Sequence, residues 1–513
     1  MGGSLGRAEH EVGGTGAAAG HPPVPDAASI DPARQIAFLW RHYLSAERGF
    51  VREGGAKVKL VIGATGAGKT HFLADVTEAA RREGFVTAQS DARVVPLGGF
   101  HLLYQALASG LDFSGLARRF VGQVLVDVGY GDPALGPGQT LFAWAASHGH
   151  EVGPLRIALS EALHRRLCAN PNLDYGYALG LMRWCESTVW GGEGGGEVEA
   201  VREAAAAPGG LLEHWLRGGR VATRDCNRLR LRRSADRYNA RLWLRSLLHF
   251  IRMAGLPGLV AAVDGLDVLV EARPRRTAAT ADVAGAAGVE GMAGAGEGVG
   301  AGGAPRYTKQ RRDDFYESLR ALIDDMGLMP GFLLVLAGPP ALVDPDNRTT
   351  GFKSYPALAE RVENEVQTVE LNCFADEIVL ERLWAADPEA GRALAEALVA
   401  AVAPDAGVGV RQRAVAAARA QWAVRDVAVS AVRRSVLAVL GAVGQGAGWE
   451  TGDGSQARIG VRPSAGAEAG VEPEVAEPEV AGWAGAAPGV GTGGAGSSGG
   501  WAPGREDDTG QGE

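Results

Sequence analysis

Cysteine and long apolar runs are scarce in this sequence, and their scarcity excludes several classes of protein. The 513 residues include four cysteines, with no C-x-x-C pair and no histidine at zinc-ligand spacing. A disulfide framework and a structural zinc site are therefore not expected, as in proteins of a reducing compartment. No run of about 18 apolar residues occurs, and the first residues lack the apolar core of a signal peptide. We expect a cytoplasmic protein that does not enter a membrane.

Glycine is abundant instead, with 76 residues, and three glycine-rich segments contain few large apolar side chains. These segments, 1–29, 277–305 and 443–513, are predicted to be disordered, because they cannot bury enough apolar surface to fold. Together they carry a formal charge of −13, whereas the whole chain carries −9. The other 384 residues therefore carry +4, and they are numerous enough to form a large core.

Apolar segments of strand and helix type alternate along the chain, which predicts an α/β fold with a mainly parallel sheet. Residues 101–250 are mostly helical in pattern and are predicted to form a helical insert. We predict an α/β domain over 30–373, followed by a small helical domain over 374–442. Helices are expected at 31–50, 69–82 and 312–326, and strands at 58–62, 85–88, 259–263, 332–337 and 367–371.

One segment matches the phosphate-binding pattern G-x-x-x-x-G-K-[ST] in full. It stands between an expected strand and an expected helix, which is the context that the pattern requires. Its glycines permit a tight turn whose N–H groups hold phosphate oxygens at the helix N-terminus. We expect Lys69 to reach the β- and γ-phosphates of ATP, and the Thr70 hydroxyl to bind Mg²⁺. The segment comprises Gly63, Ala64, Thr65, Gly66, Ala67, Gly68, Lys69 and Thr70.

A second magnesium ligand is expected at the end of a neighbouring strand. Asp264 ends the apolar segment 259–263, which makes it the candidate, although a plain turn residue is the alternative. In ATPases of this kind the next residue is usually Glu, which polarises the attacking water, but here it is Gly265. Asp267 can take this role only if the turn returns it to the γ-phosphate; otherwise it lies on the surface. Nucleotide binding is therefore better supported than hydrolysis.

Arginines supply two further candidates. Arg361 precedes the last expected strand and can stabilise phosphate charge in its own chain or across a subunit interface. The alternative is an ion pair with Glu360 or Glu365 on an exposed helix.

The segment 217–252 contains eleven arginines and two aspartates, a density that suits contact with DNA or RNA phosphates. The alternative is a set of solvated helix faces whose arginines pair with acids elsewhere, such as Asp324 and Asp325.

In these segments the chain resembles the P-loop ATP-binding proteins of bacteriophage-exclusion (BREX) systems, within the AAA+/STAND-like group. The resemblance implies an AAA+-like P-loop core with a C-terminal helical lid, ATP and Mg²⁺ as ligands, and other defence proteins as partners. A homo-oligomer is also expected, because AAA+-like sites often borrow an arginine from a neighbour. Gly265 departs from the family's usual Glu. The resemblance covers residues 55–440 and rests on VIGATGAGKTHFLADVTEAARREGFVTA, YNARLWLRSLLHFIRMAGLPGLVAAVDGLDVLV, YTKQRRDDFYESLRALIDD, LLVLAGPPALV and SYPALAERVENEV.

Three functions are compatible with these observations. The first is an ATPase that couples ATP binding and hydrolysis to conformational change in a phage-defence complex. The second is a nucleotide-dependent switch or scaffold with slow or absent hydrolysis. A small-molecule or nucleoside kinase is less favoured, because the helical insert and the lid resemble those of regulatory ATPases.

Overall fold

The computed structural model of this chain describes residues 30–190, 210–270, 307–362, 371–402 and 407–422, together with positions 436, 438 and 439. The chain divides into two units, Met1–Trp449 and Glu450–Glu513, and every described residue lies in the first. The three segments predicted to be disordered, 1–29, 277–305 and 443–513, lie outside the described residues.

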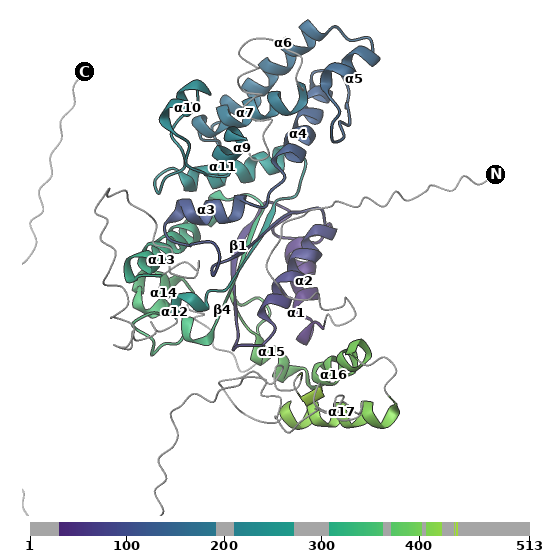
Figure 1. Cartoon of the computed structure of the whole chain (residues 1–513), viewed down its shortest axis with the longest axis vertical. Coiled ribbons are helices and arrows are strands. Elements are labelled where there is room, and N and C mark those ends of the chain that lie inside the picture. The colour runs from purple at the N-terminus through teal and green to yellow at the C-terminus, as the bar shows by residue number, and fades with distance from the viewer. Residues whose placement is uncertain are drawn as a thin grey trace, which may run out of the picture. The chain divides into compact units, whose positions relative to one another are not determined.

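A parallel five-stranded sheet organises the described part of the chain (Figure 1). Its strand order is β2-β3-β4-β1-β5, and every neighbouring pair is parallel. The carboxyl ends of the strands therefore meet along one edge, where ligands of α/β proteins usually bind. The prediction of an α/β fold with a parallel sheet is confirmed. The strands are β1 (Ala56–Ile62), β2 (Val86–Asp91), β3 (Leu259–Asp264), β4 (Phe332–Gly338) and β5 (Glu377–Val379).

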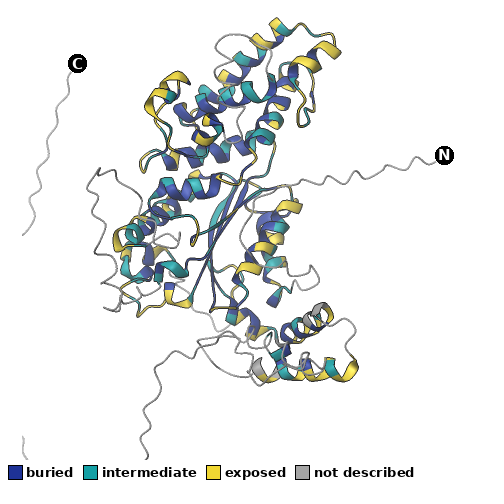
Figure 2. Ribbon diagram, viewed as in Figure 1, coloured by how far each residue is buried: buried dark blue, intermediate teal, exposed yellow. Residues whose placement is uncertain are grey.

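Both faces of this sheet are covered by helices, which is the usual arrangement for a parallel sheet of apolar strands (Figure 2). Because successive side chains of a strand point to opposite faces, Leu60 and Ile62 of β1 enter one core and Val61 enters the other. The first core includes α3 (Phe100–Ala108), α11 (Ala240–Met253) and α13 (Lys309–Asp324). The second includes α1 (Gln35–Leu39), α2 (Lys69–Arg82) and α15 (Leu380–Ala386).

Within the described residues, the segment 101–250 that is predicted to form a helical insert consists of helices and their connections. Its helices begin directly after the strand β2 and end before β3, and their buried side chains continue the first core. Besides α3 and α11, they are α4 (Phe113–Asp127), α5 (Leu141–Ser147), α6 (Val152–Leu163), η4 (His164–Cys168), α7 (Tyr175–Trp190), α9 (Leu211–Leu216) and α10 (Thr223–Arg228).

The remaining elements are two short helical segments on the second face, short connections on the first face, and helices near the end of the described chain. They are η2 (Pro32–Arg34), η3 (Trp40–Leu44), α12 (Asp267–Val270), η6 (Met326–Leu328), η7 (Pro340–Leu342), η8 (Phe352–Ser354), α14 (Pro356–Val362), α16 (Pro388–Val402) and α17 (Val408–Trp422). The helix predicted at 69–82 has those bounds, and that predicted at 312–326 is α13.

The helix predicted over 31–50 is wrong in extent, because Ala33 and Arg34 adopt left-handed backbone angles that break its start. The Asp31 carboxylate instead accepts hydrogen bonds from the N–H groups of Ile36 and Ala37, in α1. Helical structure ends at Leu44 in η3.

The fifth strand lies later in the chain than the sequence pattern indicates. Most of the predicted segment 367–371 is outside the described residues, and Leu371 is not in a strand. The strand β5 pairs only with β1 and has three residues, too few to show an apolar pattern. The segment 374–442, expected to be wholly helical, thus begins with an edge strand. The Lys59 ammonium of β1 donates hydrogen bonds to the carbonyl groups of Phe374 and Ala375, and these bonds hold the chain just before β5 against β1.

All four cysteines are described and none forms a disulfide. Across the described ranges, no helix is both long and apolar enough to cross a bilayer.

Candidate nucleotide-binding site

The loop over 63–70 joins β1 to the first turn of α2, at the carboxyl edge of the sheet. Gly68 precedes the helix with a φ of 97°, a left-handed angle that a residue with a Cβ adopts only under strain. Thr65, Gly66 and Thr70 are exposed, whereas Ala67 is buried against the second core. The loop therefore presents its outer face and the positive end of α2 to a ligand.

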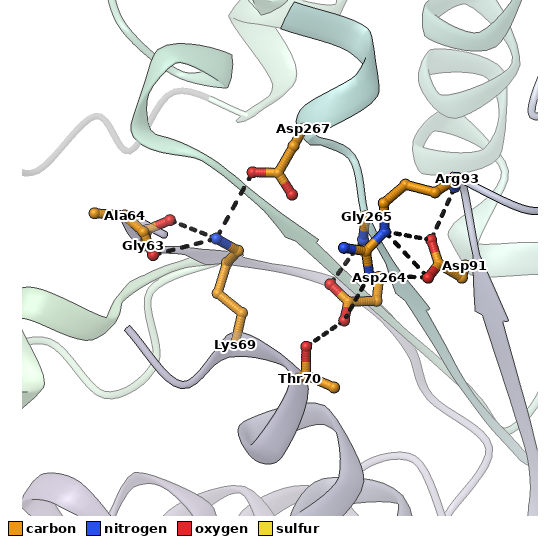
Figure 3. Close-up of polar contacts among 9 residues, drawn as sticks. All are labelled: Gly63, Ala64, Lys69, Thr70, Asp91, Arg93, Asp264, Gly265 and Asp267. Atoms are coloured by element: carbon orange, nitrogen blue, oxygen red, sulfur yellow. Dashed lines mark hydrogen bonds and ion pairs between the residues drawn. The ribbon is translucent and has the colours of Figure 1, made fainter. Parts of the chain in front are cut away.

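Lys69 is held inside this loop (Figure 3). Its buried ammonium group donates to the carbonyl oxygens of Gly63 at 2.7 Å and Ala64 at 3.3 Å. The Asp267 carboxylate lies 3.8 Å from the same ammonium. Asp267 begins α12, so the turn after β3 does return it to the phosphate loop. Asp267 thus lies beside the ammonium group that is expected to reach the phosphates, and its role toward the γ-phosphate stays a prediction.

Thr70 and Asp264 come together across the same edge. The Thr70 hydroxyl donates a hydrogen bond of 2.5 Å to Oδ2 of Asp264, and the N–H of Gly265 donates to Oδ1 at 2.7 Å. The Asp264 side chain is 14% exposed. A hydroxyl and a carboxylate in contact are the oxygen donors that a P-loop protein offers to Mg²⁺.

Arg93 and Asp91 adjoin this pair, and the sequence analysis does not include them. In the sheet register Asp91 ends β2 directly beside Asp264. The Arg93 guanidinium binds both carboxylate oxygens of Asp91, at 2.8 to 3.1 Å, and lies 3.8 Å from Asp264. Partial burial alone would raise the pKa of Asp91, but the hydrogen bonds from Arg93 outweigh it and lower the pKa below its ordinary value. Two neighbouring carboxylates thus share one guanidinium.

The backbone at Gly265 explains why no Glu follows Asp264. Gly265 has a φ of 76°, and a Cβ there would lie 2.3 Å from Oδ1 of Asp91 and 2.8 Å from Nε of Arg93. A Glu at this position would need both a strained backbone and displacement of the Asp91–Arg93 pair. In this chain the carboxylate nearest to Lys69 is supplied instead by Asp267.

Helix α15 also contacts the loop. The Glu381 carboxylate accepts a hydrogen bond of 2.6 Å from the N–H of Ala64. The indole N–H of Trp384 donates to the carbonyl of Ala67 at 3.2 Å. Sequence reasoning missed both residues, since nothing in the local pattern of α15 marks it as a neighbour of a loop more than 300 residues earlier.

Arg361 does not join this site. Its guanidinium pairs with Asp324 at 2.5 Å, and it borders a cavity of about 170 Å³ with Ala56 and Lys57, at the amino end of β1. The phosphate loop follows the opposite end of β1, roughly 20 Å away for a strand of this length. Arg361 is therefore paired with Asp324 and lies away from the phosphate loop of its own chain, and its role toward a phosphate stays a prediction.

The arginine-rich segment 217–252 is partly structural. Arg217 pairs with Glu213, and Arg241 pairs with Asp325 at 2.9 Å, one of the acids expected. Arg252 donates to the carbonyl of Pro257 at 2.8 Å. The arginines between Arg217 and Arg241 are exposed, whereas Arg245 is half-buried.

Comparison with known proteins agrees with the family resemblance. The family model described as BREX system ATP-binding protein BrxC/D matches residues 41–114 and 305–417. The predicted resemblance is confirmed in these two regions, which hold the phosphate loop and the strands β1, β2, β4 and β5. Asp264, Asp267 and the segment 217–252 lie between them. No curated protein and no solved structure matches the chain.

Proposed function

We propose that this chain, similar in two regions to BREX ATP-binding proteins, is a cytoplasmic AAA+-like P-loop ATPase of a phage-defence complex. ATP binds at residues 63–70, and its binding and hydrolysis are coupled to conformational change in the segment 374–442. The observation that carries the proposal is the hydrogen bond between Thr70 and Asp264. It joins the end of a phosphate-binding motif to an acid from another strand.

Thr70 and Asp264 fit Mg²⁺ by the chemistry of their donor atoms. Mg²⁺ prefers oxygen ligands and is usually held by one or two side chains together with substrate phosphates. Within the described ranges, no group of three or more His, Cys, Asp or Glu side chains is arranged to hold a metal ion. When bound here, Mg²⁺ neutralises charge on the phosphates. Arg93 limits the negative charge that Asp91 adds beside it.

Asp267 is the residue that we propose orients the attacking water. It is the acid paired with Lys69, and its side chain is 27% exposed, so solvent reaches it. Lys69 binds the phosphates, and the Asp267 carboxylate beside it accepts a hydrogen bond from the water. Arg361 can act on a nucleotide only in a neighbouring copy of the chain, since it lies at the other edge of its own sheet.

A nucleotide-dependent switch with slow or absent hydrolysis is the second candidate, and Gly265 is the observation that favours it. A Glu at the position that usually carries the catalytic one would strain this backbone and displace the Asp91–Arg93 pair. Asp267 has a shorter side chain and is engaged by Lys69. Both candidates require ATP binding, and they differ in phosphate release.

The test measures binding of a fluorescent ATP analogue and steady-state phosphate release for the full chain, with and without DNA. Lys69→Ala should abolish both, and Asp267→Asn should lower release at least tenfold while binding stays within about threefold. Glu161→Gln, an exposed carboxylate of α6, is the matched control. Binding without release in the unmodified chain would establish the switch. Absence of binding would overturn the whole proposal.

A further inference from the structure

A second cavity lies in the helical insert and shares no residue with the nucleotide site. Its volume is about 730 Å³, and it is enclosed by α10 and the residues that follow it. Four arginines line it: Arg220, Arg232, Arg233 and Arg237. All four are exposed, and within the described parts of the chain none lies at ion-pair distance from a carboxylate. The cavity therefore concentrates positive charge that the fold does not neutralise.

The single aspartate in the lining offsets only part of this charge, since four arginines face it. The Asp236 carboxylate accepts hydrogen bonds from the N–H groups of Tyr238 at 2.8 Å and Asn239 at 2.9 Å. It is thus used to hold the turn before α11. Polar groups of Ser234 and Asn227 complete the wall, which suits hydrogen bonding to phosphate oxygens.

Two exposed aromatic rings accompany the arginines. Tyr238 is 73% exposed, and the Arg237 guanidinium lies 4.8 Å from the centre of its ring. Tyr175 is 48% exposed, with Arg232 at 5.4 Å from its ring. The guanidinium near each ring attracts its π face and favours one orientation of the ring. Cationic groups beside open aromatic faces are the combination by which proteins hold single strands, through phosphates and stacked bases.

We propose that this cavity, lined by one arginine before α10 and three between α10 and α11, binds single-stranded nucleic acid. The backbone phosphates lie against Arg220, Arg232 and Arg233, and a base stacks on Tyr238. The anchored arginines of 217–252 hold the surrounding fold, whereas those of the cavity hold the ligand. This site is independent of the nucleotide site and does not rest on ATP binding.

The experiment titrates the full chain into fluorescein-labelled oligothymidylate and follows anisotropy over a range of KCl concentrations. The double variant Arg232→Glu/Arg233→Glu should weaken binding by tenfold or more. It should also reduce the slope of log K against log salt by about 1.4, the value expected for two lost phosphate contacts on a single strand. The matched control is Arg119→Glu/Arg165→Glu, an equal change of charge at two exposed arginines of the same insert. The control should change affinity less than twofold.

A second variant separates stacking from charge. Tyr238→Ala should weaken oligothymidylate binding at least fivefold while leaving the salt slope unchanged. Each variant should bind the ATP analogue as tightly as the unmodified chain does. A failure of the nucleic-acid proposal can therefore be distinguished from a failure of the proposed nucleotide site. Equal losses in the two double variants would overturn the proposal. So would tighter binding of duplex DNA, or displacement of the oligonucleotide by inorganic phosphate at equal phosphate concentration.

Discussion

The N–H of Ala64, in the phosphate loop, donates a hydrogen bond of 2.6 Å to the Glu381 carboxylate of α15. Trp384, on the same helix, binds the loop again through the carbonyl of Ala67. The first helix after the last strand of the sheet is therefore attached to the loop at two points. We therefore predict that a phosphate entering the loop meets the charge of Glu381, and that nucleotide binding affects the position of α15.

Removing this charge should strengthen nucleotide binding. In Glu381→Gln the side chain keeps an oxygen for the Ala64 N–H but no longer repels phosphates. We expect the affinity for ATP to rise about three- to tenfold, because two like charges in a partly exposed site repel by roughly 1 kcal/mol. Titration with a fluorescent ATP analogue measures this, with Glu389→Gln on α16 as the control. Unchanged or weaker binding would show that Glu381 only braces the loop.

Installing the usual Glu should not create a faster enzyme. Gly265→Glu places a Cβ where the left-handed backbone and the Asp91–Arg93 pair exclude it. We expect a loss of about 1–3 kcal/mol in the free energy of unfolding and no gain in phosphate release. Thermal unfolding and a phosphate assay on the same preparation check both. Gly84→Ala, at a φ of 80° with no atom near the added Cβ, is the control that isolates backbone strain from crowding. Faster release by Gly265→Glu would contradict the geometry.

Asp264 and Asp91 are adjacent in the sheet but should respond differently to substitution. Asp264→Asn removes a charge in contact with Thr70, and we expect the Mg²⁺-dependent part of ATP affinity to fall roughly 10- to 100-fold. Asp91→Asn should change it less than threefold, since Arg93 already occupies that carboxylate. Affinities measured with Mg²⁺ and with EDTA separate the two effects. Equal losses for both variants would argue against the assignment of Asp264 as the metal ligand.

Lys59 should make stability depend on pH. Its side chain is fully buried in β1, and this burial lowers its pKa from 10.5 to about 8, although the Asp376 charge acts in the opposite direction. Below pH 8 Lys59 is charged in both the folded and the unfolded chain, so folding bears the full cost of burying the charge. Between pH 8 and 10.5 the folded chain has lost this proton while the unfolded chain still holds it, so the cost falls as the pH rises. The free energy of unfolding contributed by Lys59 therefore rises through this window.

Lys59→Met removes this titration and provides the comparison. Urea unfolding of both proteins at pH 7 and pH 9.5 should show the unmodified chain gaining stability relative to Lys59→Met. If the two proteins differ in their free energy of unfolding by the same amount at both pH values, the lowered pKa of Lys59 is contradicted. The comparison cancels the titration of tyrosines, which both proteins share.

Most of the sheet was predictable because its strands are continuous apolar runs between turn residues. Four of the five strands and the helix α2 follow from such patterns. The exception, β5, has three residues and pairs with one neighbour only, so its place depends on the edge that β1 offers. The break before α1 could not be predicted from the sequence either, since Ala33 and Arg34 are not residue types that usually adopt left-handed backbone angles.

The sequence by itself determined the phosphate loop and the acid at the end of β3, because both depend on local patterns of a strand, a turn and a helix. Only the tertiary structure decided which distant groups meet them. In the folded chain Asp267 lies beside Lys69, and Arg93 pairs with Asp91. Glu381 contacts the phosphate loop, whereas Arg361 lies at the opposite edge of the sheet. The tertiary structure also separated the arginines that anchor the helical insert from those that line a cavity. These contacts arise from the order and register of strands far apart in the chain, which no local pattern contains.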